Sequence, residues 1–133
     1  MGQLKKATIL LADDHPHFPE LIKKLLEPTF EVIGSVCNGQ SLIEASLKMK
    51  PDVIITDISM PVLNGIEAVV RLRRLGSRSS VIFLTLHSDT DFVRVCFATG
   101  ANGFVSKPQV FTQLLTAISE VLAGRSFVSL HPS

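Results

Sequence analysis

Apolar residues gather along this chain in five short runs, separated by longer segments of mixed character. The runs are 7–12, 31–36, 53–57, 81–85 and 103–106. Short runs rich in β-branched residues and bounded by turn residues are typical of strands that are buried on both faces. The pattern therefore predicts five strands of a parallel sheet.

The segments between the runs have the periodicity of amphipathic helices. In the first of these segments, apolar residues recur at helical spacing, at Phe18, Leu21, Ile22, Leu25 and Leu26. The second segment opens near Asn38 and Gly39, Asn64 is a suitable N-cap for the third, and a glycine follows the third, fourth and fifth. Strands that alternate with helices predict an α/β fold, with helices on both faces of a doubly wound parallel five-stranded sheet.

Composition and charge exclude several classes of function. The formal net charge is +1 and no window is densely basic, so we expect no direct nucleic-acid binding by this chain. No run is apolar enough for a signal peptide or a membrane span, which favours a cytoplasmic protein with no membrane contact. Cys37 and Cys96 have neither metal-site nor disulfide-framework spacing, and we expect two free thiols.

Chemistry-bearing residues follow the predicted strands. Asp13 and Asp14 come after the first strand, Asp57 ends the third, Thr85 ends the fourth and Lys107 follows the fifth. Parallel strands bring their carboxyl ends to one rim, so we expect these side chains to meet in a crevice. Three carboxylates together require a counter-charge, and carboxylate oxygens favour Mg²⁺ or Mn²⁺. The cluster indicates phosphoryl transfer, with Asp57 as acceptor, Asp13 and Asp14 holding the metal, and Thr85 and Lys107 binding the phosphoryl group.

With these motifs the sequence resembles the receiver domain of two-component response regulators, over about residues 6–123. The stretches that carry the resemblance are 9–15 (ILLADDH), 52–65 (DVIITDISMPVLNG), 81–85 (VIFLT) and 100–108 (GANGFVSKP). The resemblance implies a flavodoxin-like (βα)5 sheet with strand order 2-1-3-4-5. We accordingly expect a receiver domain at 1–124, with 125–133 as a tail or as the start of a linker to an output domain.

The resemblance also implies roles at the metal and acceptor site. Asp57 is expected to take a phosphoryl group from the phosphohistidine of a histidine kinase. Asp14, Asp57 and the backbone carbonyl of Ser59 are expected to bind Mg²⁺ directly, and Asp13 mainly through water. His15 and His17 are expected to be loop and helix-start residues, because Mg²⁺ prefers oxygen.

The remaining implied roles concern switching and timing. Thr85 and Phe104 are expected to form the switch pair, with Phe104 turning inward once Asp57 is phosphorylated. Ser59 and His87 are expected to tune the lifetime of the phosphate. The surface made by the fourth helix, the fifth strand and the last helix is expected to read out the change. The resemblance further implies a cis Lys107–Pro108 bond.

The implied function is a phosphoacceptor signalling domain that catalyses only its own phosphorylation and dephosphorylation. An Asp-His-Pro motif after the first strand and Ala-Gly-Arg-Ser-Phe-Val-Ser near the end are similar to the NarL/FixJ subfamily. Its members usually control transcription through a C-terminal DNA-binding domain, and a homodimer on phosphorylation is possible. The alternative is a stand-alone receiver or phosphorelay intermediate that acts through protein–protein contacts.

Other classes agree less well with the residues. A haloacid-dehalogenase-type phosphatase needs a second Asp two residues after the nucleophile, where this chain has Ser59. A flavodoxin-like cofactor binder would not place Asp13 and Asp14 in its first phosphate loop. Neither glycine pattern of a P-loop or a dinucleotide site occurs. A pseudo-receiver without activity would be expected to have lost Asp57, Lys107 or the acid pair.

Overall fold

The structure, a computed structural model, describes residues 5–86 and 90–129. The strands are β1 (Thr8–Ala12), β2 (Glu31–Val36), β3 (Val53–Asp57), β4 (Ser80–Thr85), β5 (Gly103–Ser106) and β6 (Phe127–Ser129). The helices are α1 (Phe18–Leu26), α2 (Gly39–Met49), α3 (Gly65–Arg74), α4 (Thr90–Ala98), the 3₁₀ turn η1 (Lys107–Gln109) and α5 (Val110–Leu122). The five predicted strands and five predicted helices are all present.

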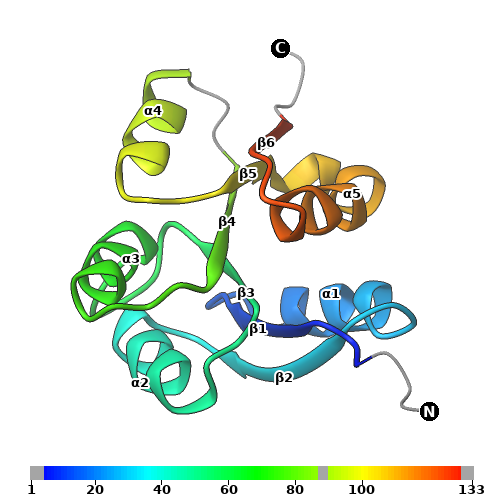
Figure 1. The fold of residues 1–133 in the computed structure, drawn as a ribbon, viewed down its shortest axis with the longest axis horizontal. Helices are drawn as coiled ribbons and strands as arrows, with labels where there is room; N and C mark the ends of the chain where they lie inside the picture. Colours follow the sequence, from blue (N-terminus) through cyan, green and yellow to red (C-terminus); the bar gives the residue numbers. More distant parts are fainter. Residues whose placement is uncertain (1–4, 87–89, 130–133) are drawn as a thin grey trace.

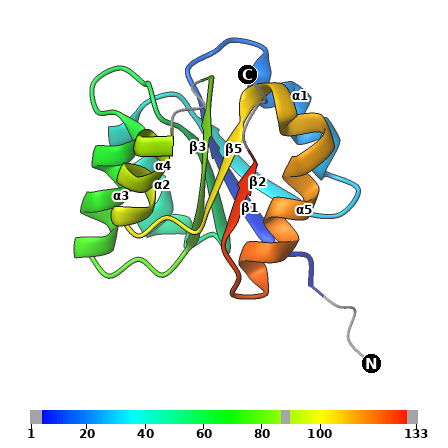
Figure 2. The ribbon, with the colours of Figure 1, turned by 90° about the horizontal axis from the view of Figure 1, so that it is seen from above.

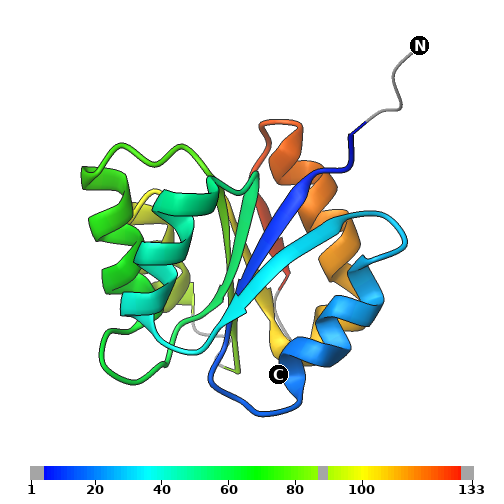
Figure 3. The same cartoon turned by 90° about the horizontal axis from the view of Figure 1, so that it is seen from below.

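The strands form one parallel sheet in the order β2-β1-β3-β4-β5-β6 (Figure 1). The predicted order 2-1-3-4-5 is confirmed, and β6 extends the sheet by one strand. Helices α1 and α5 cover one face of the sheet, and α2, α3 and α4 cover the other (Figures 2 and 3). This is the doubly wound arrangement, in which all carboxyl ends of the parallel strands lie at one edge.

Each face of the sheet has its own apolar core. Alternate residues of the strands point to opposite faces, so Ile9 and Leu11 pack on the α1 and α5 side while Leu10 and Ala12 pack on the α2 and α3 side. In β3 all five residues are buried, because this strand lies inside the sheet with helices on both faces. Asp57, the last of them, is therefore delivered to the rim by a rigid element.

Asparagines cap the first turns of α2 and α3, and the cap at Asn64 was predicted from the sequence. The side chain of Asn38 accepts a hydrogen bond from the Ser41 N–H at 2.8 Å, and Asn64 accepts one from the Glu67 N–H at the same distance. The Asn64 amide also donates to the Glu67 carboxylate at 2.9 Å. These caps satisfy backbone donors that the first helical turn leaves without partners.

Close backbone packing fixes the loop between β3 and α3. The N–H of Gly39 donates to the Leu63 carbonyl, and the N–H of Gly65 donates to the Ile58 carbonyl, each at 2.8 Å. A Cβ at either glycine would lie 2.1 Å from a carbonyl oxygen, that of Leu63 or of Asp57. Between these anchors, Val62 has φ of 67° and is highly exposed. A β-branched residue in this region stores strain of about 1 to 3 kcal/mol, which the anchored loop has to offset.

The segment after α5 differs from the sequence-based expectation. Phe127–Ser129 of the expected tail pairs in parallel with β5, and Phe104 lies in register with Val128. An isolated run of three residues carries too little periodicity to be distinguished from a tail. The outer edge of β5 is therefore covered by β6.

The expectation of a cis Lys107–Pro108 bond is wrong, because this bond is trans. The chain does not need a cis bond to turn here. Ser106 is extended, and Pro108 then lies within the turn η1, which leads directly into α5. Proline is tolerated in a first helical turn because its missing N–H has no partner there.

In the part of the chain that the structure describes, no helix has the length and apolar character needed to cross a membrane.

Replacing Gly65 by Ala should destabilise the fold by about 3 kcal/mol, because the new Cβ overlaps the Asp57 backbone and cannot be relieved by a side-chain rotation. Urea unfolding followed by circular dichroism measures this loss. Gly34→Ala is the matched control, since its Cβ meets only side-chain ends of Leu10 and Met49 at 3.2 and 3.6 Å. Equal losses for the two variants would contradict the proposed packing at Gly65.

The two cysteines should differ in reactivity, because Cys37 is exposed and Cys96 is buried in the core on the α4 side. Burial raises the pKa of the Cys96 thiol to about 11, and the thiolate is the reactive form. A disulfide reagent at pH 8 should label one thiol of the native protein and two in denaturant. Cys37→Ser should remove the rapid reaction, and rapid labelling of that variant would contradict the assignment.

Candidate functional site

Three strand ends bring opposite charges together at the rim. Asp13 follows β1, Asp57 ends β3 and Lys107 follows β5. The Lys107 ammonium donates to Asp13 Oδ2 and to Asp57 Oδ2, both at 3.0 Å. All three side chains are more than nine-tenths buried. The predicted convergence of these residues is therefore present, although they are 50 and 94 positions apart in the sequence.

The first turn of α1 supports the ammonium of Lys107. Its Nζ lies 4.7 Å from the centre of the Phe18 ring, which is the geometry of a cation–π contact. The sequence presents Phe18 as one member of an apolar helical stripe, so this second role could not be inferred from periodicity. Phe18 helps to hold Lys107 over the crevice.

Burial dominates the electrostatics of Asp57. Loss of solvent raises the pKa of its carboxyl above the ordinary value, and the nearby Asp13 charge acts in the same direction. The hydrogen bond and charge of Lys107 lower that pKa, but they do not fully offset the burial. The ionised carboxylate is therefore held in an unfavourable environment, which a further cation would relieve.

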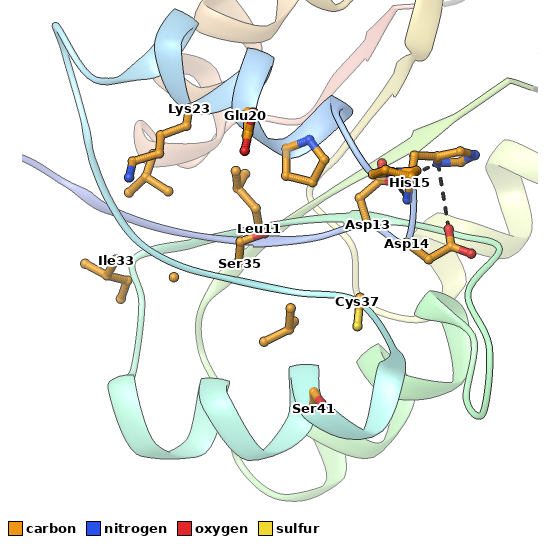
Figure 4. Close-up of a pocket in the computed structure, with 15 residues that line it drawn as sticks. Leu11, Asp13, Asp14, His15, Glu20, Lys23, Ile33, Ser35, Cys37 and Ser41 are labelled. Atoms are coloured by element: carbon orange, nitrogen blue, oxygen red, sulfur yellow. Dashed lines mark hydrogen bonds and ion pairs between the residues drawn. The ribbon is translucent and has the colours of Figure 1, made fainter.

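His15 lies in the same cluster, which sequence reasoning did not predict. Its Nδ1 is 2.6 Å from Asp13 Oδ1, 3.4 Å from Asp57 Oδ2 and 3.7 Å from Asp14 Oδ1. Figure 4 shows the ring beside Asp13 and Asp14 at the end of β1. The position of His15 directly after Asp13 and Asp14 in the sequence could have indicated this. The preference of Mg²⁺ for oxygen ligands instead favoured a loop residue without a role as a ligand. His17, by contrast, is the exposed N-cap residue of α1.

The other predicted residues lie around this centre. Thr85 ends β4 and is buried, in register with the buried Ser106 of β5. Phe104 is completely buried among the side chains on the α4 side. Ser59 is exposed in the loop after β3. His87 lies outside the described residues.

Phe104 already occupies the buried position that was expected only after phosphorylation. The expectation was that its ring turns inward on phosphorylation, whereas the structure already has it in the inward position. On α4, Val95 is about half exposed while Cys96 is buried. As expected, the apolar residues of this short helix do not all face the core.

The donor set of the cluster fits a divalent cation. Asp13, Asp14, His15 and Asp57 each offer a ligand atom within 4.8 Å of the others. Asp13 and Asp57 share the Lys107 ammonium, and Asp14 lies beside His15, so among the described contacts three carboxylates have one Lys or Arg cation between them. An oxygen-rich site with this charge suits Mg²⁺ or Mn²⁺.

A groove opens from the cluster towards the edge of the sheet. It has a volume of about 740 Å³ and runs between α1, β2 and the start of α2 (Figure 4). Asp13, Asp14 and His15 lie at one end of it, and Cys37 and Ser41 line its wall. The acidic site is thus open to solvent on the Asp14 and His15 side.

Comparison with known proteins agrees with this geometry. The family model described as "Response regulator receiver domain" matches residues 9–119. "Transcriptional regulatory protein DegU" of Brevibacillus brevis is 36% identical over 129 residues, covering 96% of this chain and 54% of DegU. "Nitrate/nitrite response regulator protein NarL" of Escherichia coli is 31% identical over 131 residues, covering 97% of this chain and 61% of NarL.

A solved structure supports the same assignment. The crystal structure of a two-component response regulator of the LuxR family from an Aurantimonas species matches with a TM-score of 0.88 at 30% identity, covering 92% of this chain and 89% of that one. The fold and the acid cluster define a receiver-type signalling domain. The chain belongs to the response regulator receiver domain family, and its relatives include regulators of the NarL/FixJ type. It spans between 54% and 61% of the length of the two curated relatives named above.

Replacing Asp57 by Asn should stabilise the metal-free protein at pH 7. A carboxyl whose pKa is raised on folding contributes stability below its unfolded value of 3.8, and that contribution is lost as the pH rises through the folded value. The neutral side-chain amide of Asp57→Asn does not ionise, so the variant avoids this loss of stability, while Lys107 keeps its contact with Asp13. The advantage of the variant in free energy of unfolding should shrink as the pH approaches 4.

Urea titrations in EDTA at pH 7 and pH 4 measure this difference. Glu44→Gln, at an exposed position on α2, is the control for removing one negative charge. A variant that is less stable than the wild type at pH 7, or a gain that grows on acidification, would contradict the assigned cause.

Proposed function

We propose that this chain is a phosphoacceptor that takes a phosphoryl group onto Asp57 from the phosphohistidine of a histidine kinase. The observation that carries the proposal is the Lys107 ammonium, which bridges Asp57 and Asp13 at 3.0 Å each. A buried cation beside a buried carboxylate is suited to the negative charge that develops on a transferred phosphoryl group.

The proposed transfer is a single displacement at phosphorus. An Asp57 carboxylate oxygen forms a bond to phosphorus while the bond from phosphorus to the donor imidazole nitrogen breaks. The imidazole leaves with the electron pair and takes up a proton from solvent. Lys107 orients the acceptor and neutralises phosphoryl oxygens, and the Thr85 hydroxyl donates to one of them.

The residues proposed to hold a divalent metal are Asp14, Asp57 and the Ser59 backbone carbonyl, with Asp13 acting mainly through water. When bound, Mg²⁺ or Mn²⁺ would supply charge neutralisation to the phosphoryl oxygens. The excess negative charge of the cluster supports this part of the proposal. Ser59 and His87 are proposed to set the lifetime of the phosphoaspartate.

Switching is proposed to follow from movement of Thr85 towards the phosphoryl group. Phe104 is proposed to be held inward in the phosphorylated state and to turn outward in a second state. The surface formed by α4, β5 and α5, with β6 along the edge of β5, would then report the change.

The output is proposed to be transcriptional control through a domain beyond the receiver. This rests on the similarity to DegU, a transcriptional regulatory protein, and on the share of the length of DegU and NarL that the chain spans. Residues 1–124 are then the receiver, and 125–133 lead towards the output domain. Homodimerisation on phosphorylation belongs to the same proposal. A cytoplasmic location is supported by two unpaired thiols, which a reducing compartment maintains.

The test is phosphorylation by a small acyl phosphate in the presence of Mg²⁺, followed by intact-mass spectrometry. The wild type should gain one phosphoryl group, and Asp57→Asn should gain none. Lys107→Ala should react at least about tenfold more slowly, because a group that stabilises developing charge is lost. Asp52→Asn is the control, since Asp52 is exposed just before β3 and, among the contacts described, its side chain bonds only to Thr8. An undiminished mass gain in Asp57→Asn would remove Asp57 from the acceptor role.

A further inference from the structure

We propose that His15 is a nitrogen ligand of the metal site and makes the site favour Mn²⁺ or Co²⁺ over Mg²⁺. This inference rests on the proposed function, because it concerns the metal that the phosphoacceptor site would hold. It departs from the all-oxygen ligand set expected from the sequence. The proposal concerns metal selectivity and assigns His15 no part in the transfer of the phosphoryl group.

The position of the imidazole carries the argument. Nδ1 of His15 lies within 3.7 Å of a carboxylate oxygen from each of Asp13, Asp14 and Asp57. The backbone N–H of His15 also donates to Asp13 Oδ1 at 2.8 Å, which holds the loop against the acid. One ligand atom from each of Asp13, Asp14, His15 and Asp57 therefore lies within 4.8 Å of the others, and Figure 4 shows the ring beside Asp13 and Asp14.

No single arrangement of protons satisfies all of the contacts of this nitrogen. Nδ1 lies 2.6 Å from Asp13 Oδ1 and 3.0 Å from the Lys107 ammonium. If Nδ1 carries a proton, it donates to Asp13, but the proton also lies close to the Lys107 ammonium and is repelled by it. If Nδ1 carries no proton, it accepts from Lys107, but its lone pair and the Asp13 carboxylate repel each other. A metal ion among these groups removes the conflict, because the lone pair and the carboxylate oxygens would all face a positive charge.

The chemistry of the donor decides which metal benefits. Mg²⁺ binds oxygen ligands and gives up water reluctantly, so an added imidazole does little for it. First-row transition ions accept imidazole nitrogen together with carboxylate oxygen, and Co²⁺ binds such sites more tightly than Mn²⁺. His17 offers an internal comparison, because it is exposed two residues further on and lies outside the cluster of ligand atoms found among the described residues.

The experiment is pulsed electron paramagnetic resonance of the protein loaded with Mn²⁺. Nitrogen bound directly to Mn²⁺ modulates the spin echo, and labelling histidine with ¹⁵N changes that modulation. The wild type and His17→Ala should show the nitrogen coupling, and His15→Ala should lack it. Titration should show Mn²⁺ affinity falling at least about tenfold in His15→Ala, because losing a direct ligand should weaken binding no less than losing a partner of a ligand does, with Mg²⁺ affinity unchanged in competition with Mn²⁺.

Three outcomes would overturn the inference. The first is bound Mn²⁺ without nitrogen coupling in the wild type, and the second is coupling that persists in His15→Ala. The third is tighter binding of every metal by His15→Ala, which would mean that the ring occupies the position of the metal. Acyl phosphate labelling of the same samples with Mg²⁺ separates the two proposals. Normal labelling of Asp57 without nitrogen coupling refutes only the role of His15, whereas absence of labelling with coupling present refutes only the phosphoacceptor function.

Discussion

The arrangement of this rim depends on one buried ammonium between two buried carboxylates. Lys107 cannot lie at 3.0 Å from both Asp13 and Asp57 unless β1, β3 and β5 end at the same level of the sheet. Burying these charges has a large desolvation cost, and removing the ammonium, which would leave two buried carboxylates without a counter-charge, is expected to cost about 3 to 5 kcal/mol. The ion triad therefore favours the strand register as well as the chemistry. Phe18 adds to it by covering the ammonium from α1.

The same triad has more negative than positive charge. Backbone packing at the end of β3 keeps Asp57 from moving away from Asp13 to reduce their repulsion. Gly65 allows α3 to begin against the Asp57 carbonyl, where no side chain fits. Asp57 therefore cannot move away from Asp13 without displacing α3. A bound cation or protonation of a carboxyl can reduce the repulsion between Asp57 and Asp13, which agrees with the raised pKa of Asp57. Rigid backbone packing thus holds this carboxylate in place for the proposed metal and phosphoryl group.

The sequence predicted the parts of this structure that periodicity and strand ends determine. The buried β-branched run of β3 and the helical stripe containing Ile22 and Leu26 have no other reasonable arrangement, and parallel strand ends share one edge. Hydrophobic periodicity does not determine side-chain rotamers or the pairing of a very short strand. The direction of the His15 ring, the contact of Phe18 with Lys107 and the three-residue strand β6 each depend on neighbours distant in sequence. The metal ligand set is therefore less predictable than the fold.

Strand β6 changes how a signal at the rim can reach the surface. Phe104 is fully buried, and its backbone is in register with Val128 of β6. The Cβ position of Gly103 is already close to Ile82 and Val121, so β5 has little room to move alone. Close-packed interiors pass such displacements to their neighbours rather than absorb them. A shift of Phe104 must therefore move either α4, which packs on its side of the sheet, or β6, which continues into the chain beyond residue 129. We therefore include the edge of the sheet at β6 in the proposed output surface.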